Sequence, residues 1–312
     1  MRPKPGHPAR NHRICPWRDS LETPGGAGAA GKIAAMQVAD PLGRRNRLLL
    51  REMVKTDFKM RYQGSFLGHL WSILKPLALF AVMYIVFVRF LRFGAGIPHF
   101  AVSLLLAMTM WTFFGEAVGQ GMNSIVARGD LLRKISFPKI IVVLSATVGA
   151  LINFAINLVV VLVFAIINGV QFHWYILLAP LVFVELYLFA LGLALLLSAL
   201  YVRFRDVGHL WDIVMQGWFY ATPIIYPLSM VYAPPGGVAT ATRMWMAKLL
   251  LMSPMAQMIQ DMRTLVVLPT DTVWNFIGNP VIKPIPLVIV VVVLVLGIRV
   301  FNARSAMFAE EI

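Results

Sequence analysis

The stretch that decides the fold is RRNRLLLREMVKTDFKMRYQGSFLGHLWSILKPLALFAVMYIVFVRF, residues 44–90. Its first part, residues 44–62, predicts an amphipathic helix, because apolar and basic residues each recur every four positions on neighbouring faces. The apolar row is Leu50, Val54, Phe58 and Tyr62, and the basic row is Arg51, Lys55 and Lys59. Such a helix lies in the plane of a membrane with its cations toward anionic head groups. Asp57 and Arg61 fall on the apolar side, where they neutralise each other as an i,i+4 pair or meet a protein partner.

The second part of the stretch turns and enters the membrane. Gly64 and Gly68 allow the chain to bend, and Trp71 is suited to the membrane interface because its ring is amphipathic. Residues 77–88 then carry no charge. A surface helix that leads directly into a membrane span suggests a protein that receives force at the cytoplasmic face.

The composition excludes a soluble domain. Of the 312 residues, 59% are hydrophobic and only 13% are charged, with a mean hydropathy of +0.75, whereas soluble chains carry about 25% charged residues. The net charge of +14 does not indicate nucleic-acid binding, because the basic residues lie between hydrophobic spans. Cys15 is the single cysteine, and the six histidines lack metal-ligand spacing. We therefore expect no metal site.

Residues 1–40 are expected to be a disordered N-terminal extension, because they are rich in Pro, Gly, Ala and Arg without apolar periodicity. No apolar segment follows the arginines as in a signal peptide, and Met36 is an alternative start. Residues 26–32 match GxxxxGK, but Ile33 stands where Ser or Thr must bind magnesium, and no strand precedes the motif. We therefore expect no bound ATP or other cofactor in this chain.

The rest of the chain predicts an all-α integral membrane protein with six transmembrane helices, each near the roughly 20 residues that a bilayer requires. We place the spans at 70–91, 98–118, 140–167, 174–201, 207–228 and 284–302. Of the 28 lysines and arginines, 22 then fall on the side of the N-terminus and six on the other. The positive-inside rule makes both termini cytoplasmic. The domains are the amphipathic helix and bend (41–69), the transmembrane domain (70–302) and a cytoplasmic tail (303–312).

Two connections between spans are informative. The loop 119–139 mixes apolar residues with four cations and ends at Pro138, which is suited to starting a helix. It is either an ordinary basic loop or a short docking helix whose apolar side enters a groove on a soluble partner. The region 229–283 holds two apolar stretches, 241–252 and 255–268, each too short to cross. They predict a re-entrant or interfacial helix pair, which requires packing on protein or on a cavity.

Polar residues inside the spans are candidate functional groups. These are Glu116, Asn153, Asn157 and Glu185. Glu185 is expected to be protonated or paired, and Glu116 to pair with Lys75. Gly149, Asn153 and Asn157 share one face of the third span, so they predict hydrogen bonds to the fourth span. A substrate or proton role is the alternative.

Aromatic residues form two helical faces with little charge. The faces are Phe80, Tyr84 and Phe87 on the first span, and Trp211, Met215 and Trp218 on the fifth. Aromatic rings have flat apolar faces that suit sugar rings, so these residues are candidates for the lining of a substrate channel. Packing against lipid or other helices is the alternative.

Five motifs in this order resemble the membrane subunits of type 2 ABC exporters, in the subfamily that exports O-antigen, capsule, teichoic acid and related lipid-linked glycans. They are KTDFKMRYQGSFLGHLWSILKPL (55–77), GDLLRKISFPK (129–139), ALYVRFRDVGHLW (199–211), ATPIIYP (221–227) and LLLMSPMAQMIQDMR (249–263). The resemblance covers about residues 44–312. One departure is Met-Ser-Pro-Met at 252–255, where Asn-Pro is usual in the family; it implies a differently capped turn.

The resemblance implies a homodimer that carries two cytoplasmic ATPase subunits, which bind the ATP and magnesium. It makes 44–62 the interface helix, 124–135 the coupling helix and 241–268 the extracellular gate helices. The residues that it implies in ATPase coupling are Phe58, Arg61, Arg128, Asp130, Leu131, Leu132 and Arg133. The implied function is export of a polyprenyl-linked polysaccharide across the bacterial cytoplasmic membrane, by a subunit that is not itself an enzyme.

Two other functions are alternatives to this one. The first is export of a small hydrophobic drug or antibiotic by the same class of transporter. The second is an intramembrane glycosyl- or acyltransferase, which requires a cluster such as a DxD pair or a His-Asp arrangement. No such cluster is visible in the sequence, where Asp261 and Asp271 stand isolated. This argues against an enzyme.

Overall fold

A computed structural model describes residues 43–61, 70–94, 96–135, 137–232, 238, 240–267, 283–305 and 307–308, without the side chains of Phe58, Met60 and Arg61. The expected disordered extension, the bend after the first helix and the region 268–282 lie outside the described residues. All regular structure in the described ranges is helical, which confirms the predicted all-α class.

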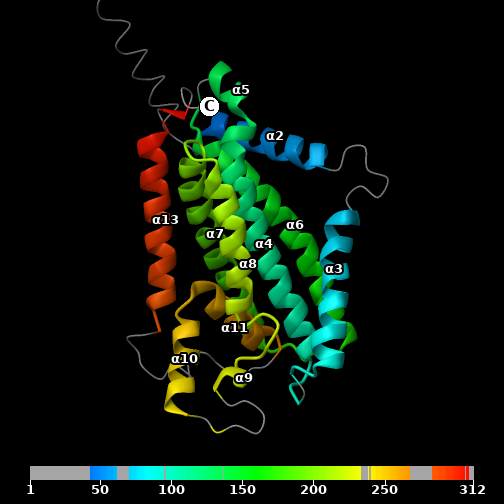
Figure 1. Cartoon of the computed structure of the whole chain (residues 1–312). Helices are drawn as coiled ribbons and strands as arrows, with labels where there is room; N and C mark the ends of the chain where they lie inside the picture. Colours follow the sequence, from blue (N-terminus) through cyan, green and yellow to red (C-terminus); the bar gives the residue numbers. More distant parts are fainter. Residues whose placement is uncertain are drawn as a thin grey trace, which may run out of the picture.

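The stretch 44–90 folds into a helix across the bundle end followed by a helix along the bundle. Helix α2 (Arg44–Arg61) runs across one end of the bundle in Figure 1, while α3 (Trp71–Met83) runs alongside the other long helices. A π-helical segment, η2 (Tyr84–Phe90), continues α3, and together they are long and apolar enough to cross a membrane. The predicted amphipathic helix and first span are thus observed within one or two residues of their expected bounds.

Helix α4 (Phe100–Ala127) is the centre of the bundle, because it is apolar around most of its circumference and therefore buried. It packs against α6 (Ile140–Ile167) and α7 (Ala179–Tyr201), and α7 packs in turn against α13 (Ile285–Arg304). A 3₁₀ turn, η3 (Trp174–Leu178), leads into α7. These long helices lie side by side in Figure 1.

Helices α7 and α13 touch at two glycines. A Cβ atom on Gly192 of α7 would lie 2.7 Å from the Cα of Leu294, and a Cβ atom on Gly297 of α13 would run into the Gly192 carbonyl. Small residues let membrane helices approach until their backbones are in contact. Gly192 and Gly297 therefore set the distance between α7 and α13.

Five of the six expected spans are long enough to cross a membrane in the described residues. The expected fifth span, 207–228, is shorter than predicted: α8 (Asp206–Ala221) has 16 residues, or about 24 Å of helix. It ends because Thr222 adopts an extended conformation just before Pro223, which cannot continue the helical hydrogen bonds. Figure 1 shows α8 running along the bundle beside α4 and α7.

The expected coupling helix 124–135 is divided between two elements. Helix α4 continues to Ala127, and Arg128 leaves the helical conformation before the six-residue helix α5 (Gly129–Lys134) begins. The predicted second span, 98–118, is therefore longer than expected at its C-terminal end. Figure 1 places α5, α2 and the end of α13 together. We call this part of the molecule the coupling end.

Three short helices occupy the opposite half of the molecule (Figure 1). They are α9 (Ser229–Tyr232), α10 (Ala241–Leu251) and α11 (Pro254–Val266). Helix α11 packs against α4, α7 and α13, so its apolar side is buried in the bundle. We refer to α10 and α11 as the outer segment. Its bounds agree with the two short stretches predicted at 241–252 and 255–268.

Candidate functional site

Arg128 ties the parts of the coupling end together. Its guanidinium forms an ion pair with Asp57 of α2 and donates a hydrogen bond of 2.6 Å to the Ser145 hydroxyl of α6. Both members of the ion pair are mostly shielded, with side-chain exposures of 19% and 25%. Because Arg128 stands between α4 and α5, one side chain connects α2, the junction of α4 and α5, and α6.

Asp57 thus has a partner that the sequence analysis did not name, and its expected pairing with Arg61 stays a prediction, because that side chain lies outside the described part. Asp57 meets a cation from a distant part of the same chain, which helical spacing alone cannot reveal. The side chains of Phe58 and Arg61 lie outside the described part, so their expected contacts with an ATPase stay predictions. Elsewhere on α2, Lys55 and Glu52 form an exposed pair at 2.8 Å, and this hydrogen bond lowers the pKa of Glu52.

The docking face expected on α5 also changes. Leu132 is only 6% exposed and packs into a core with Ile125, Phe137 and Ile141. It is consequently not available to a partner, and Leu131 is only half-buried against the same core. The exposed residues of this segment are Asp130, Arg133, Lys134 and Ile135. A polar face with one apolar residue at its edge thus replaces the apolar face that we expected.

The chain's last described turn joins the coupling end. Lys139 donates a hydrogen bond to the Ser305 carbonyl, and its ammonium lies 5.6 Å from the centre of the Phe308 ring. Phe308 is fully buried and packs edge-to-face on Phe301 of α13. The expected tail 303–312 is thus anchored to the exit of the coupling segment, at least as far as Phe308.

The intramembrane polar residues form a network between α3, α4 and α6. Glu116 of α4 accepts hydrogen bonds from Asn153 of α6, at 2.9 Å, and from Gln120, at 2.8 Å. The pairing expected between Glu116 and Lys75 is therefore not what the structure has. Asn153 and Asn157 face α4 and α3 rather than the fourth span, because α6 packs most closely on α4.

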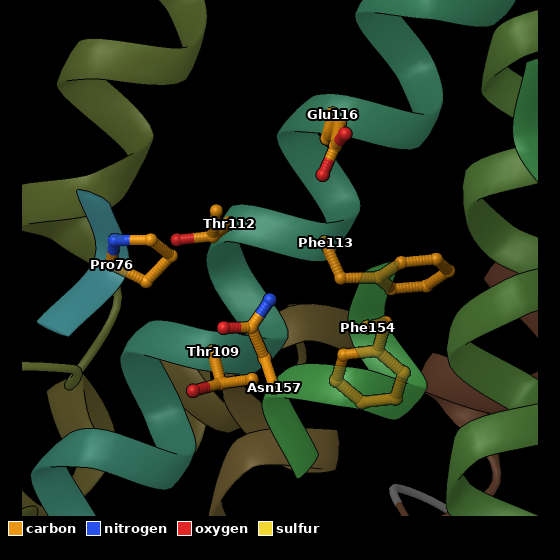
Figure 2. A pocket seen from close by; sticks show the side chains of 7 residues that line it. All are labelled: Pro76, Thr109, Thr112, Phe113, Glu116, Phe154 and Asn157. Carbon is orange, nitrogen blue, oxygen red and sulfur yellow. The ribbon is translucent and has the colours of Figure 1, made fainter. Parts of the chain in front are cut away.

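Asn157 donates a hydrogen bond to a backbone carbonyl whose usual helical donor position is occupied by a proline. Pro76 lacks the N–H that would bond to the Ser72 carbonyl four residues earlier. The Asn157 amide donates to that carbonyl at 3.3 Å. A polar cavity of about 10 Å³ adjoins this contact, about the size that one water molecule needs. Figure 2 shows the Asn157 amide between Thr109 and Thr112 of α4 and the Phe154 ring.

We expect the energetic role of Asn157 to depend on Pro76. Asn157→Ala should lower the free energy of unfolding by about 0.6 kcal/mol or more, the average for a side-chain hydrogen bond between membrane helices. In a Pro76→Ala background the loss should shrink, because the introduced alanine supplies its own N–H to the Ser72 carbonyl. Thermal unfolding of the four variants in one detergent measures this coupling. Asn168→Ala removes a bond to Phe164 and is the control, with the same effect in either background.

Glu185 has another acidic residue near it rather than a cation. In the described part of the chain no Lys or Arg lies within ion-pair distance of Glu185, and the carboxyl group of Asp261 on α11 lies near it. Asp261 was expected from the sequence to be isolated, and the structure corrects this. The third and fourth spans are joined instead by the hydroxyls of Thr147 and Tyr187, 3.3 Å apart.

The aromatic residues of the first span pack against other parts of the same chain. Phe80 is buried, with its ring edge-to-face on Phe164 of α6 at 5.6 Å and 5.9 Å from the Tyr84 ring. Phe87, in the π-helical segment, contacts Phe93 at 5.6 Å. The expected common face is thus present, and it packs against the same chain.

The aromatic residues of α8 belong to a second cluster with α4 and α7. Trp218 packs edge-to-face on Trp111 and Phe114, and Trp211 is buried beside Phe114. Met215 is half-buried against the same core. This cluster and the first-span aromatics pack into one hydrophobic core of the chain. The role of both sets as a channel lining stays a prediction.

Arg263 is a site that the sequence reasoning missed. The charge count places it among the six cations on the outer side, yet it is only 5% exposed. A lone arginine among apolar residues such as Met258, Ile259 and Val266 was the available signal, because a buried charge requires partners.

These features define a multi-pass helical membrane protein in which an ion pair joins α2 to the turn between α4 and α5. Residues 49–266 match the family model described as the ABC-2 type transporter. That match covers well over half of the chain, and the chain belongs to this family.

Three relatives are similar over long stretches. The chain is 36% identical over 185 residues to the O-antigen export system permease protein RfbA of Myxococcus xanthus, a region that covers 59% of this chain and 70% of that protein. Two proteins of the same name from Klebsiella pneumoniae are 26% and 25% identical over 266 residues, which is 84% of this chain and 94% of each relative. The family resemblance inferred from the motifs is confirmed.

Proposed function

We propose that this chain is the membrane-spanning permease subunit of an ATP-driven exporter of O-antigen-type, polyprenyl-linked polysaccharide. The observation that carries the proposal is the similarity to three O-antigen export permeases, two of them along 84% of the chain. Power comes from a separate ATPase, two copies of which bind a dimer of this chain. Capsule and teichoic-acid polymers belong to the same chemical class and are alternative cargoes.

The geometry of the coupling end supports this proposal. An ATPase that pushes on α5 meets exposed Asp130, Arg133 and Lys134. The Arg128 bonds to Asp57 and Ser145 then pass that displacement to α2 and α6. A mostly shielded ion pair is suited to this task, because separating its two charges would leave each of them unpaired. The pair therefore stays together when α5 is displaced.

The proposed topology has six crossings with both termini in the cytoplasm. Helix α8 and the broken segment after it make the fifth crossing together, and the outer segment is re-entrant. Figure 1 supports this arrangement, because α2, α5 and the end of α13 share one end of the bundle, and α9 and α10 lie at the other. The basic residues of α2 and α5 then face the cytoplasm, as the positive-inside rule requires.

We propose that the polysaccharide passes between two copies of the chain, along aromatic surfaces of α3 and α8. Rings that stack loosely on sugars let a polymer slide, whereas strong hydrogen bonds would hold it. Phe90, beside the face of the first span, is exposed in the single chain and open to a partner or a substrate. Tyr220 is exposed too, but on the side of α8 opposite to Trp211, Met215 and Trp218. Tyr84, Phe87, Met215 and Trp218 are half-buried.

Deletion of the gene in its own host tests the proposed function. We expect long-chain polysaccharide to disappear from the cell surface and lipid-linked polymer to accumulate inside, because synthesis continues without export. Expression of the intact chain with its ATPase should restore the surface polymer. Unchanged surface polymer would contradict the proposal. A changed sensitivity to hydrophobic drugs with normal surface polymer would instead favour the drug-exporter alternative.

A further inference from the structure

Arg263 of α11 bridges the outer segment to the chain just beyond α8. Its Nη1 donates to the Pro223 carbonyl and its Nη2 to the Ile224 carbonyl, each at 2.6 Å. The side chain is 5% exposed, and no carboxylate lies within ion-pair distance of it in the described part of the chain. Two backbone carbonyls from one short segment therefore hold a buried charge.

The break in α8 explains why an arginine is suited to this position. Thr222 ends the helix in an extended conformation, and Pro223 and Ile224 follow outside any helix. Carbonyls without a donor are costly at membrane depth, since no water can replace the missing hydrogen bond. The planar guanidinium offers two donors in a fixed fork and matches two neighbouring acceptors, whereas an ammonium is a single point charge. A cation is also favoured beyond the C-terminal end of a helix.

A second bond joins the same two parts. The Trp218 indole of α8 donates to the Ser253 hydroxyl at the turn between α10 and α11, at 3.3 Å. Ser253 stands at the start of α11 but does not cap it with its side chain. The hydroxyl within the Met-Ser-Pro-Met departure thus joins α8 to the outer segment. Arg263 and Ser253 lie at opposite ends of α11, so the helix is fastened at both.

We propose that Arg263 is a positioning residue for export: it holds α11, and with it the outer segment, against the broken end of α8. This inference rests on the proposed function, in which the outer segment must be displaced for a polymer to leave. The two carbonyl bonds make α11 and the 222–224 segment one unit, so that α8 and the outer segment move together. Two of the five motifs, at 221–227 and 249–263, contain the two sides of this one contact.

Thiol labelling of the protein in lipid nanodiscs tests the inference. In a Cys15→Ser background, Met258→Cys places a thiol on the inner side of α11, where Met258 is 1% exposed. We expect a water-soluble maleimide to label this thiol about tenfold faster after Arg263→Met, since two charge-assisted hydrogen bonds restrain local opening. Arg263→Lys, which keeps the charge but reaches fewer acceptors, should give an intermediate rate.

Two controls separate local release from general loosening. Ile141→Cys reports on the core of the coupling end, where Ile141 is 1% exposed, and its labelling should not change. Arg299→Met repeats the substitution at an exposed position of α13 and should alter neither rate. Unchanged labelling at Met258→Cys, or equal acceleration at both thiols, overturns the inference. If Arg263→Met does not accumulate in the membrane, the labelling rate of Met258→Cys is measured with Arg263→Lys instead. A rate equal to that of the parent then overturns the inference.

An export assay on the same variants separates this inference from the proposed function. With the ATPase present, Arg263→Met should restore little surface polysaccharide to the deletion strain, and Arg299→Met should restore the parental amount. Full export by Arg263→Met contradicts the positioning role. Failure of the unmodified chain to restore export contradicts the proposed function, and the labelling rates then still decide whether Arg263 holds α11.

Discussion

Gly192→Ala is expected to lower the stability of the protein by about 1–3 kcal/mol, the usual range for an overpacked core, and Gly192→Leu to abolish accumulation in the membrane. An added Cβ would lie 2.7 Å from the Leu294 Cα and 2.8 Å from its amide nitrogen. Backbone atoms cannot change rotamer to make room, so α13 must move away from α7 along their whole contact. Thermal unfolding of the detergent-extracted protein, followed by size-exclusion chromatography, measures the loss.

Gly149 of α6 provides the matched control. It lies inside a long helix like Gly192, but a Cβ there would have no heavy atom within 4 Å. Gly149→Ala should therefore unfold no earlier than the parent, since alanine favours the helix over glycine. If Gly192→Leu accumulated and unfolded like the parent, the close contact of α7 with α13 would be refuted.

The second large effect is expected at Arg128. Arg128→Ala should reduce export more than it reduces the amount of folded protein, because it removes the connection of α2 to α5 and α6 while most of the bundle remains packed. The stability loss should be about 1.5–3 kcal/mol, as for hydrogen bonds to charged groups. Asp57→Asn should have a smaller effect in the same direction. Surface polysaccharide and the ATPase rate of the assembled complex are the measurements.

A charge exchange distinguishes this ion pair from a general requirement for arginine. Asp57→Arg combined with Arg128→Asp should recover part of the lost stability, although the bond to Ser145 remains broken. The control is the exposed pair on the same helix: Lys55→Ala should change the stability far less than Arg128→Ala, because both partners are solvated. Equal losses at Lys55 and Arg128 would contradict the role of the Arg128 pair.

The order and position of five of the six expected spans followed from the sequence, because lipid imposes a simple rule on it. A run such as 140–167 must be a helix, since its backbone has no other way to satisfy its polar groups. The same rule misplaced the end of the fifth span, because residues 222–228 are apolar enough for a membrane but begin at Thr222-Pro223. There the backbone leaves the helix, and the carbonyls of Pro223 and Ile224 accept hydrogen bonds from Arg263 instead.

Partners across helices could not be predicted in the same way. Spacing placed Asn153 and Asn157 on one face of α6, and that face exists. Which neighbour it meets depends on how four helices pack, and α4 rather than α7 took that place. Leu132 of α5 shows the same limit. Its apolar side chain is compatible with a groove on a partner, but in the structure it is buried in the core of its own chain.

The anchoring of Phe308 has a consequence for biosynthesis. The coupling end combines α2 and α5, which leave the ribosome early, with a turn at Ser305–Phe308 that follows more than 160 residues after Lys139. A nascent chain that stops before α13 therefore has its spans but not the packing of Phe301 and Phe308 beneath the coupling segment. On the proposed function, in which α5 contacts the ATPase, the coupling end gains this packing only when synthesis has passed residue 308.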